Sequence, residues 1–303
     1  MLNGLKALFS KEDSNSKFGI ALRTQVGSYA LNNVDENQYL ADEYFTETTE
    51  TASAWLEELV STHTFKGSGY LVLSASHYYN VQIIKPELPE EEIPSALKWL
   101  VKDIVPIEPD DMLVDYYDSP IIVSGTQKIN VICSHLASLK KFSDSFKRYQ
   151  IDLKGIITDE FAFANLVTEQ ADPTLLICQQ PFEEVFILIV KENQVYFSRR
   201  LRGFSDIGGY SVEQLNNGIC ESLSLEVQKS LDYYERLLKQ SPVAKIKVLL
   251  PILNEDFVIE SINKNTNVEV SRLDLPSEYA TKRNCAASVG AMMELDKQEV
   301  SDD

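Results

Sequence analysis

The sequence is poor in the residues that build metal sites and disulfide frameworks. It has only four cysteines and three histidines. The cysteines are widely scattered and form no CxxC pair, which argues against a structural zinc site and against a secreted disulfide framework. We therefore expect four buried, reduced thiols. We also expect no metal site, because the histidines share no ligand spacing. The residues concerned are Cys133, Cys178, Cys220, Cys285, His63, His77 and His135.

Long apolar runs and positive charge are also scarce. No stretch of about 18 apolar residues occurs, so no membrane span is expected. No signal peptide is expected either, because no long apolar run follows the start. The formal net charge is −18, and the longest basic cluster is Arg199-Arg200 followed by Arg202. Such a chain would be repelled by a phosphate backbone and by an anionic bilayer surface. Nucleic acid is therefore not an expected partner.

The two ends carry weak signals. The apolar residues of segment 2–9 could share one face of a helix, but the segment is short and contains Gly4. A frayed end is therefore favoured over a membrane-touching helix. The acidic stretch 295–303 is expected to be disordered.

The residues that are abundant indicate a folded α/β protein. Hydrophobic residues make up 44% of the chain, which excludes a disordered protein, and 303 residues suit two lobes better than one core. Apolar periodicity predicts a mixed order of strands and helices. The predicted helices are 51–62, 93–104, 136–149, 159–168, 211–221, 224–239, 254–264 and 279–294. The predicted strands are 18–26, 70–74, 79–84, 112–117, 128–133, 174–178, 184–190, 195–201, 245–250 and 268–273.

The helix predicted at 93–104 has an uneven apolar face. Trp99 falls off the main apolar stripe, so we expect it to be partly exposed or to face a neighbouring subdomain. The helix should end before Pro106, because the residue preceding a proline disfavours helical geometry. Its predicted buried face consists of Ile93, Leu97, Leu100, Val101 and Ile104.

Four segments carry a family resemblance, in the same order along the chain. They are SALKWLVKDIVPIEP (95–109) with the following VDY (114–116), ITDEFAFANL (157–166), the arginine and glycine stretch 199–209, and LSLEVQKSLDYY (223–234). Together they resemble the PilM family of type IV pilus biogenesis proteins, which includes MshI of the mannose-sensitive haemagglutinin (MSHA) pilus.

The resemblance implies an α/β, two-lobed actin-like ATPase fold, with RNase H-like duplicated lobes and an α+β subdomain inserted into the first lobe. The implied first lobe is 1–76 and 154–173, and the inserted subdomain is 77–153. The second lobe is then 174–276, a C-terminal helix at 277–294 packs on the first lobe, and 295–303 is the disordered tail.

Actin-like ATPases need glycine and aspartate in the loops that hold the nucleotide, because glycine lets the backbone approach phosphate and aspartate serves the magnesium shell. This sequence lacks them in the corresponding segments 18–26, 175–182 and 248–254, apart from Gly19. The resemblance therefore implies a degenerate cleft without cofactor, metal or catalysis. The residues expected near it are Ile20, Arg23, Cys178, Gln179 and Leu250. Arg23 could reach a phosphate, but we expect it at the surface. Two alternatives stay open: a switch protein that still binds ATP, and a polymerising cytoskeletal protomer.

The function implied by the resemblance is that of a scaffold or adaptor in the assembly platform of a type IV, MSHA-like pilus. Such a protein is cytoplasmic and sits at the inner membrane through its partners, without a span of its own. It binds the cytoplasmic tail of a PilN-type inner-membrane protein, and the pilus motor ATPase is a further candidate partner. The expected tail-binding residues are Ile83, Leu97, Trp99 and Tyr116. Acidic residues at 90–92 and 110–111 favour a tail that carries Arg or Lys beside apolar residues.

Overall fold

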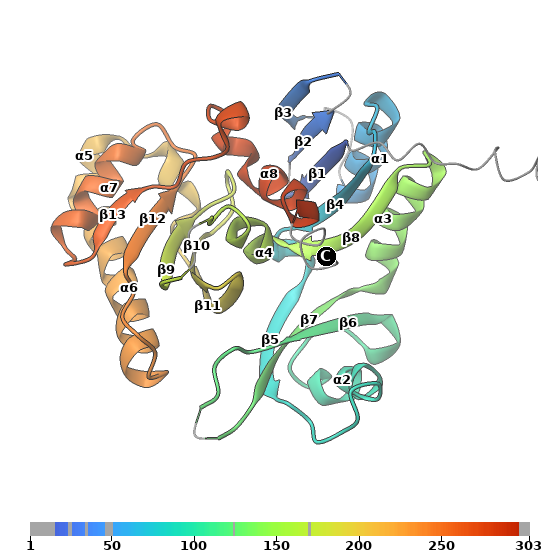
Figure 1. The fold of residues 1–303 in the computed structure, drawn as a ribbon, viewed down its shortest axis with the longest axis horizontal. Helices are drawn as coiled ribbons and strands as arrows, with labels where there is room; N and C mark the ends of the chain where they lie inside the picture. The colour runs from blue at the N-terminus through green and yellow to red at the C-terminus, as the bar shows by residue number, and fades with distance from the viewer. Residues whose placement is uncertain are drawn as a thin grey trace, which may run out of the picture.

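The computed structural model describes residues 16–23, 26–33, 36–45, 51–123, 125–168 and 171–296. The expectations for 2–9 and for 297–303 therefore lie outside the described residues. Three β-sheets organise the chain (Figure 1). The first sheet contains β1 (Lys17–Leu22), β2 (Gly27–Asn33), β3 (Gln38–Tyr44), β4 (Ser68–Leu73) and β8 (Asp152–Thr158). The second contains β9 (Thr174–Cys178), β10 (Val185–Lys191), β11 (Gln194–Leu201), β12 (Lys245–Leu249) and β13 (Glu269–Arg272). The third contains β5 (Tyr79–Ile84), β6 (Met112–Asp118) and β7 (Lys128–His135).

The two five-stranded sheets have the same topology. Their strand orders are β3-β2-β1-β4-β8 and β11-β10-β9-β12-β13. In each, three antiparallel strands are followed by two parallel ones. Glu192 and Asn193 form the two-residue turn between β10 and β11, and both have positive φ, which is typical of such hairpin turns. We call the unit built on the first sheet the first lobe and the unit built on the second sheet the second lobe.

Helices cover both faces of each large sheet. On the outer faces, α1 (Ala52–Thr62) and α3 (Leu136–Arg148) pack on the first sheet, and α6 (Cys220–Asp232) and α7 (Glu255–Lys264) pack on the second. Thr51 starts α1 by accepting a hydrogen bond from the Ala54 N–H. Side chains along β1, β9 and β10 alternate between the inner and outer clusters, which is the two-residue period of a strand.

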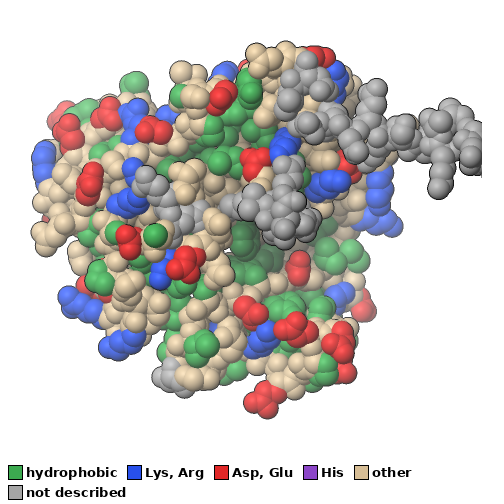
Figure 2. All heavy atoms as spheres, viewed as in Figure 1, with side chains coloured by type: hydrophobic (Ala, Val, Ile, Leu, Met, Phe, Trp, Pro, Cys, Tyr) green, Lys and Arg blue, Asp and Glu red, His purple; other side chains and the backbone are tan. Residues whose placement is uncertain are grey.

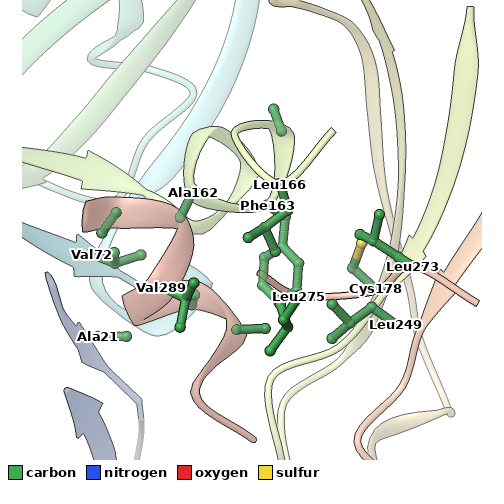
Figure 3. Packing of buried hydrophobic residues seen from close by; sticks show 14 of the residues in the cluster. Ala21, Val72, Ala162, Phe163, Leu166, Cys178, Leu249, Leu273, Leu275 and Val289 are labelled. Carbon is green, nitrogen blue, oxygen red and sulfur yellow. The ribbon is translucent and has the colours of Figure 1, made fainter. Parts of the chain in front are cut away.

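Two helices lie between the sheets, α4 (Asp159–Ala164) and α8 (Ala286–Met292) (Figures 1 and 3). Their closeness depends on glycine. A Cβ on Gly290 would lie 1.9 Å from the Ala162 carbonyl oxygen, and one on Gly19 of β1 would lie 2.0 Å from that of Ser288. The small residues of α8 thus let it approach its neighbours backbone to backbone.

The third sheet and α2 (Ile93–Val101) form a separate cluster around Ile93, Leu97 and Val101. The chain enters this unit after β4 and leaves it into α3, so residues 74–135 lie between two elements of the first lobe. We call them the inserted subdomain. The expected range 77–153 stays a prediction, and matching the two large sheets favours the shorter range, because α3 occupies in one lobe the place of α7 in the other.

The connection between β6 and β7 ties the inserted subdomain to the second lobe. Ile121 in this connection is only 4% exposed and belongs to the outer hydrophobic cluster of the second lobe, with Val123 packed against it. Figure 1 shows this connection reaching toward α6. The inserted subdomain therefore contacts both lobes.

Several predicted elements differ from the structure. The helix predicted at 93–104 ends at Val101. Leu100, within the helix, and Ile104, beyond its end, are both exposed and not buried. Strands β2, β3 and β8 were not predicted. The last helix is broken by 3₁₀ turns and begins only at Ala286. Leu295, expected in a disordered tail, is buried against the core between the sheets. No helix among the described residues is long and apolar enough to cross a membrane.

Candidate functional site

The loop after β1 contains Arg23, and the expectation that Arg23 lies at the surface is wrong. Only 4% of the residue is exposed. Its Nη2 donates to Oε1 of Glu43 on β3 at 2.6 Å, and Glu43 in turn accepts from Nδ2 of Asn284 at 2.8 Å. Ile20, also expected near this loop, is fully buried in the outer core of the first sheet. Arg23 therefore helps to join β1 and β3 to the segment before α8.

The loop after β9 is likewise closed by its own residues. Cys178 is fully buried, and burial raises the pKa of its thiol well above the usual range, so it is a poor nucleophile. The Nε2 of Gln179 donates to the carbonyl oxygens of Glu183 at 2.9 Å and Ser205 at 3.0 Å. The expected thiol burial is confirmed for all four cysteines, which are free and buried.

The loop after β12 is filled by a buried carboxylate. Leu250 is fully buried, and its N–H donates to Oε1 of Glu255 at 2.8 Å. The carboxylate of Glu255 also pairs with Arg283 and, at 3.3 Å, with Nε of Arg272. These contacts take up the hydrogen-bonding capacity that a ligand would otherwise use.

A cavity of about 430 Å³ remains beside these loops. Asp42 and Glu43 line it from β3, and residues 251–252 and 281–285 line it from the other side. Two cations also line it, and both are already paired: Nζ of Lys282 lies 3.7 Å from Oδ1 of Asp42, and Arg283 pairs with Glu255. Within the part of the chain that the structure describes, no group of three His, Cys, Asp or Glu side chains is placed to hold a metal ion.

A cluster of four side chains joins the two lobes and the inserted subdomain. We call it the interlobe ion cluster, and it consists of Tyr78, Asp159, Glu160 and Arg200. Nη2 of Arg200, on β11, lies 2.6 Å from Oδ1 of Asp159 and 3.1 Å from Oε1 of Glu160, both on α4. It also lies 2.7 Å from the hydroxyl oxygen of Tyr78, whose single O–H lies within hydrogen-bond distance of both carboxylates. Tyr78 precedes β5, so one guanidinium holds three parts of the chain together.

The electrostatics of the interlobe ion cluster are unbalanced, because two buried carboxylates share one cation. Asp159 is 1% exposed and Glu160 is 3% exposed. Burial, and then repulsion by Asp159, raise the pKa of Glu160 although Arg200 acts in the opposite direction. Burial and the same carboxylates also raise the pKa of Tyr78 well above its usual range. The guanidinium of Arg200 lies 4.8 Å from the centre of the Phe186 ring, which adds a cation–π contact.

A larger cleft, of about 950 Å³, lies between the inserted subdomain and the second lobe. One wall is a face of the third sheet, with Gln82, Tyr117 and Asn130 side by side in the register of its strands. The opposite wall is β11 and α6. We call it the basic cleft, because its lining includes Lys128, Arg199, Arg200, Arg202 and Lys229 against the carboxylates of Glu160 and Glu184.

The structure brings three of the four residues expected to bind the partner tail into one hydrophobic cluster and leaves the fourth exposed. Leu97 is fully buried in the cluster of the inserted subdomain, and Ile83 and Tyr116 pack against the same cluster. Trp99 is 62% exposed, which confirms its predicted exposure. None of the four lines the basic cleft, because in β5 and β6 the neighbouring residues Gln82 and Tyr117 point to it instead.

Comparison with known proteins identifies the fold. No protein-family model and no curated protein matches the sequence. Solved structures do match. The PilM–PilN type IV pilus biogenesis complex aligns with a TM-score of 0.66 at 12% identity, over 94% of this chain and 98% of the other. A Bacteroides thetaiotaomicron protein with actin-like ATPase fold and unknown function aligns with a TM-score of 0.54 at 9% identity, over 94% and 99%. The chain has the actin-like ATPase fold.

A structure from a secretion system also aligns with this chain. The cytoplasmic domain of EpsL, an inner membrane component of the type II secretion system of Vibrio cholerae, aligns with a TM-score of 0.53 at 13% identity, over 88% of this chain and 94% of the other. The predicted fold class is therefore confirmed. These identities are low, so the likeness establishes the actin-like architecture and leaves the site to be argued from its own residues.

Sequence reasoning missed the interlobe ion cluster and the basic cleft. Asp159 and Glu160 stood inside a motif that we had singled out, and Arg200 in the longest basic cluster, but nothing local pairs residues 40 positions apart. The signal that could have found the cluster is chemical. Adjacent acids at the start of an otherwise apolar helix need a buried cation.

Proposed function

We propose that this protein is a non-catalytic scaffold in the assembly platform of a type IV, MSHA-like pilus, comparable to MshI of the PilM family. The observation that carries the proposal is the full-length match to the PilM–PilN complex, combined with nucleotide loops filled by their own side chains. The scaffold sits on the cytoplasmic side of the inner membrane and is held there by partner proteins. The pilus motor ATPase is a second candidate partner.

The partner we propose is the cytoplasmic tail of a PilN-type inner-membrane protein, bound on the inserted subdomain. Trp99 (62%), Leu100 (49%) and Ile104 (59%) expose apolar surface along and just beyond α2. Exposed carboxylates surround that surface, and Figure 2 shows acidic side chains gathered over this region. They are Glu90, Glu91, Glu92, Asp103, Asp110 and Asp111. A tail with Arg or Lys beside apolar side chains matches this surface.

The test is binding of a labelled PilN-type tail to the wild type and to Trp99→Ala. We expect the substitution to weaken binding by about tenfold or more, as for an aromatic anchor. Leu225→Ala is the control, because Leu225 is a similarly exposed apolar residue on a helix of the second lobe. Circular dichroism checks folding. Unchanged affinity in folded Trp99→Ala protein would remove Trp99 from the interface.

A switch that binds ATP through a divergent cleft is the second candidate function. One observation favours it: among the described residues, Nε and Nη1 of the buried Arg23 have no hydrogen-bond partner. The scaffold proposal predicts no rise in melting temperature with about 1 mM ATP and Mg²⁺, since a ligand stabilises only by binding the native state. A clear rise that is abolished by Arg23→Ala would establish the switch instead.

A further inference from the structure

The basic cleft differs in charge from the rest of the molecule. The chain as a whole carries −18, yet the cleft presents five cationic side chains against two carboxylates. Three of these cations are already paired inside the protein. Arg200 belongs to the interlobe ion cluster, and Arg199 and Lys229 share Glu226.

Two of the cations remain available to a ligand. Lys128 donates to Oε1 of Gln82 at 3.2 Å, and neither Lys128 nor Arg202 has an ion-pair partner among the described residues. Lys128 is on the third sheet and Arg202 follows β11, so they approach the cleft from opposite walls. An anionic ligand between them would be held from both sides.

The backbone of β11 is the second feature of the basic cleft. β11 is the outermost strand of its sheet and pairs only with β10. Six consecutive residues, 195–200, line the cleft. A strand that presented one face would contribute alternate residues, so β11 presents its edge. Within the described chain, residues 196–200 make no backbone hydrogen bond beyond the pairing with β10. Free strand edges accept extended peptides.

Aromatic rings complete the walls. Tyr79 and Tyr117 come from the third sheet, and Tyr196, Phe197 and Tyr233 from the second lobe. Rings of this kind give apolar side chains of a peptide a surface to pack on, while the tyrosine hydroxyls stay hydrated.

We propose that the basic cleft binds an extended, acidic segment of a partner protein, which adds as a strand to the free edge of β11. Its carboxylates would meet Lys128 and Arg202, and its alternate apolar side chains would pack on the aromatic walls. This partner is distinct in chemistry from the basic tail proposed for the α2 surface. The two binding events can therefore fail independently.

The test uses a fluorescein-labelled peptide of alternating glutamate and valine, about twelve residues long, and measures anisotropy with the full chain at low salt. We expect saturable binding that weakens as salt is added, because exposed charge pairs are screened. A glutamine–valine peptide of equal length should not bind, because it lacks the carboxylates that Lys128 and Arg202 would pair with. No saturable binding of the glutamate peptide, or equal binding of the glutamine peptide, would overturn the proposal.

Charge reversal locates the site. Lys128→Glu with Arg202→Glu should weaken binding of the glutamate–valine peptide by about tenfold or more. Lys147→Glu with Lys264→Glu changes the net charge equally at exposed positions that do not line the cleft, and it should change affinity less than about twofold. Equal losses in both double variants would mean that the peptide responds to net charge alone, which would overturn the site.

Backbone methylation tests the strand addition. One peptide carries N-methyl groups on every valine and another on every glutamate, so each loses the amide donors along one edge. One of the two should bind at least about tenfold more weakly, because only one edge can face β11. Equal binding of both would overturn the pairing with β11. A tenfold gain in affinity after deletion of residues 297–303 would show that the acidic end of this chain is the occupant, and would overturn the choice of a partner.

Discussion

The two faces of the third sheet have different surroundings, whereas the two lobes are built on sheets of the same topology. One face is covered by α2. The outer side of α2 exposes Trp99, with acidic residues around it. The other face is open to the basic cleft. Neighbouring residues are divided between them: Ile83 and Tyr116 belong to the covered face, and Gln82 and Tyr117 to the open one. The strand period of two thus gives one small sheet an apolar face under α2 and a more polar face toward the basic cleft.

The cationic side chains of the molecule fall into two groups. Some are paired inside the fold, and others remain available to a ligand. Within and between the lobes, Arg200 and Arg283 are neutralised by buried carboxylates, and Arg23 by the partly buried carboxylate of Glu43. In the basic cleft, Lys128 and Arg202 are not neutralised in this way. Removing a charge of the first kind should cost stability, and removing one of the second kind should cost only binding.

The largest expected effect is that of Arg200→Ala, which leaves Asp159 and Glu160 buried without their cation. We expect a loss of about 3–5 kcal/mol in the free energy of unfolding, as for one partner removed from a buried ion pair. Urea denaturation measures it. Arg199→Ala is the matched control, because Arg199 is a 40% exposed side chain whose pair with Glu226 should contribute less than about 1 kcal/mol. Equal losses in the two variants would show that the interlobe ion cluster does not join the lobes.

The second largest expected effect is a difference in stability between substitutions on the buried and on the exposed side of α2. Leu97→Ala removes a fully buried side chain and should lower the free energy of unfolding by about 2–5 kcal/mol. Trp99→Ala, two residues away, removes a larger but exposed side chain and should change stability by less than about 0.5 kcal/mol. Thermal melting of both variants measures the contrast. A loss in Trp99→Ala comparable to that in Leu97→Ala would mean that Trp99 is part of the core.

The fold was more predictable than the site. Helix α1 has a clean apolar period with a threonine cap, and its boundaries were predicted to within one residue. Strands β2 and β3 were missed because the sequence from 27 to 44 mixes polar, aromatic and small residues. Their inward side chains, such as Ala30 and Ala41, are small because α8 and the 3₁₀ turns before it lie close to them. That reason exists only in the tertiary structure.

The candidate site depends on pairings that no local pattern encodes. Leu100 and Ile104 fit the apolar period predicted for this helix, yet Leu100 is exposed within α2 and Ile104 is exposed beyond its end at Val101. Arg23 looked like an isolated cation because its partner, Glu43, lies two strands away in the sheet order. Sequence reasoning found the right segments in both cases and could not assign their partners.

The smallest expected effect concerns the pH dependence of the interlobe ion cluster. The pKa of Glu160 is raised, first by burial and then by Asp159, so the folded protein binds the proton of Glu160 more tightly than the unfolded chain does. The ionised form therefore lowers stability at neutral pH. The free-energy cost of the ionised Glu160 carboxylate disappears as pH falls through its raised pKa toward the ordinary pKa of a glutamate. Glu160→Gln mimics the protonated acid at every pH. We expect its melting temperature to equal or exceed that of the wild type at pH 7.5, with a gap that closes toward pH 5.

Glu57→Gln should behave in the opposite way and completes the test. A hydrogen bond from Ser145, with further help from Arg148, lowers the pKa of Glu57, so its ionised form stabilises the fold above the ordinary glutamate pKa. That stability is lost as pH falls through the lowered value. Glu57→Gln should therefore melt below the wild type at pH 7.5, and the two melting temperatures should converge in acid. Melting curves of the wild type, Glu160→Gln and Glu57→Gln between pH 4 and 8 distinguish the two effects, because the three proteins have all other titratable groups in common. A Glu160→Gln variant that melts well below the wild type at pH 7.5 would mean that Arg200 outweighs burial. The ionised carboxylates of Asp159 and Glu160 would then stabilise the contact between the lobes rather than destabilise it.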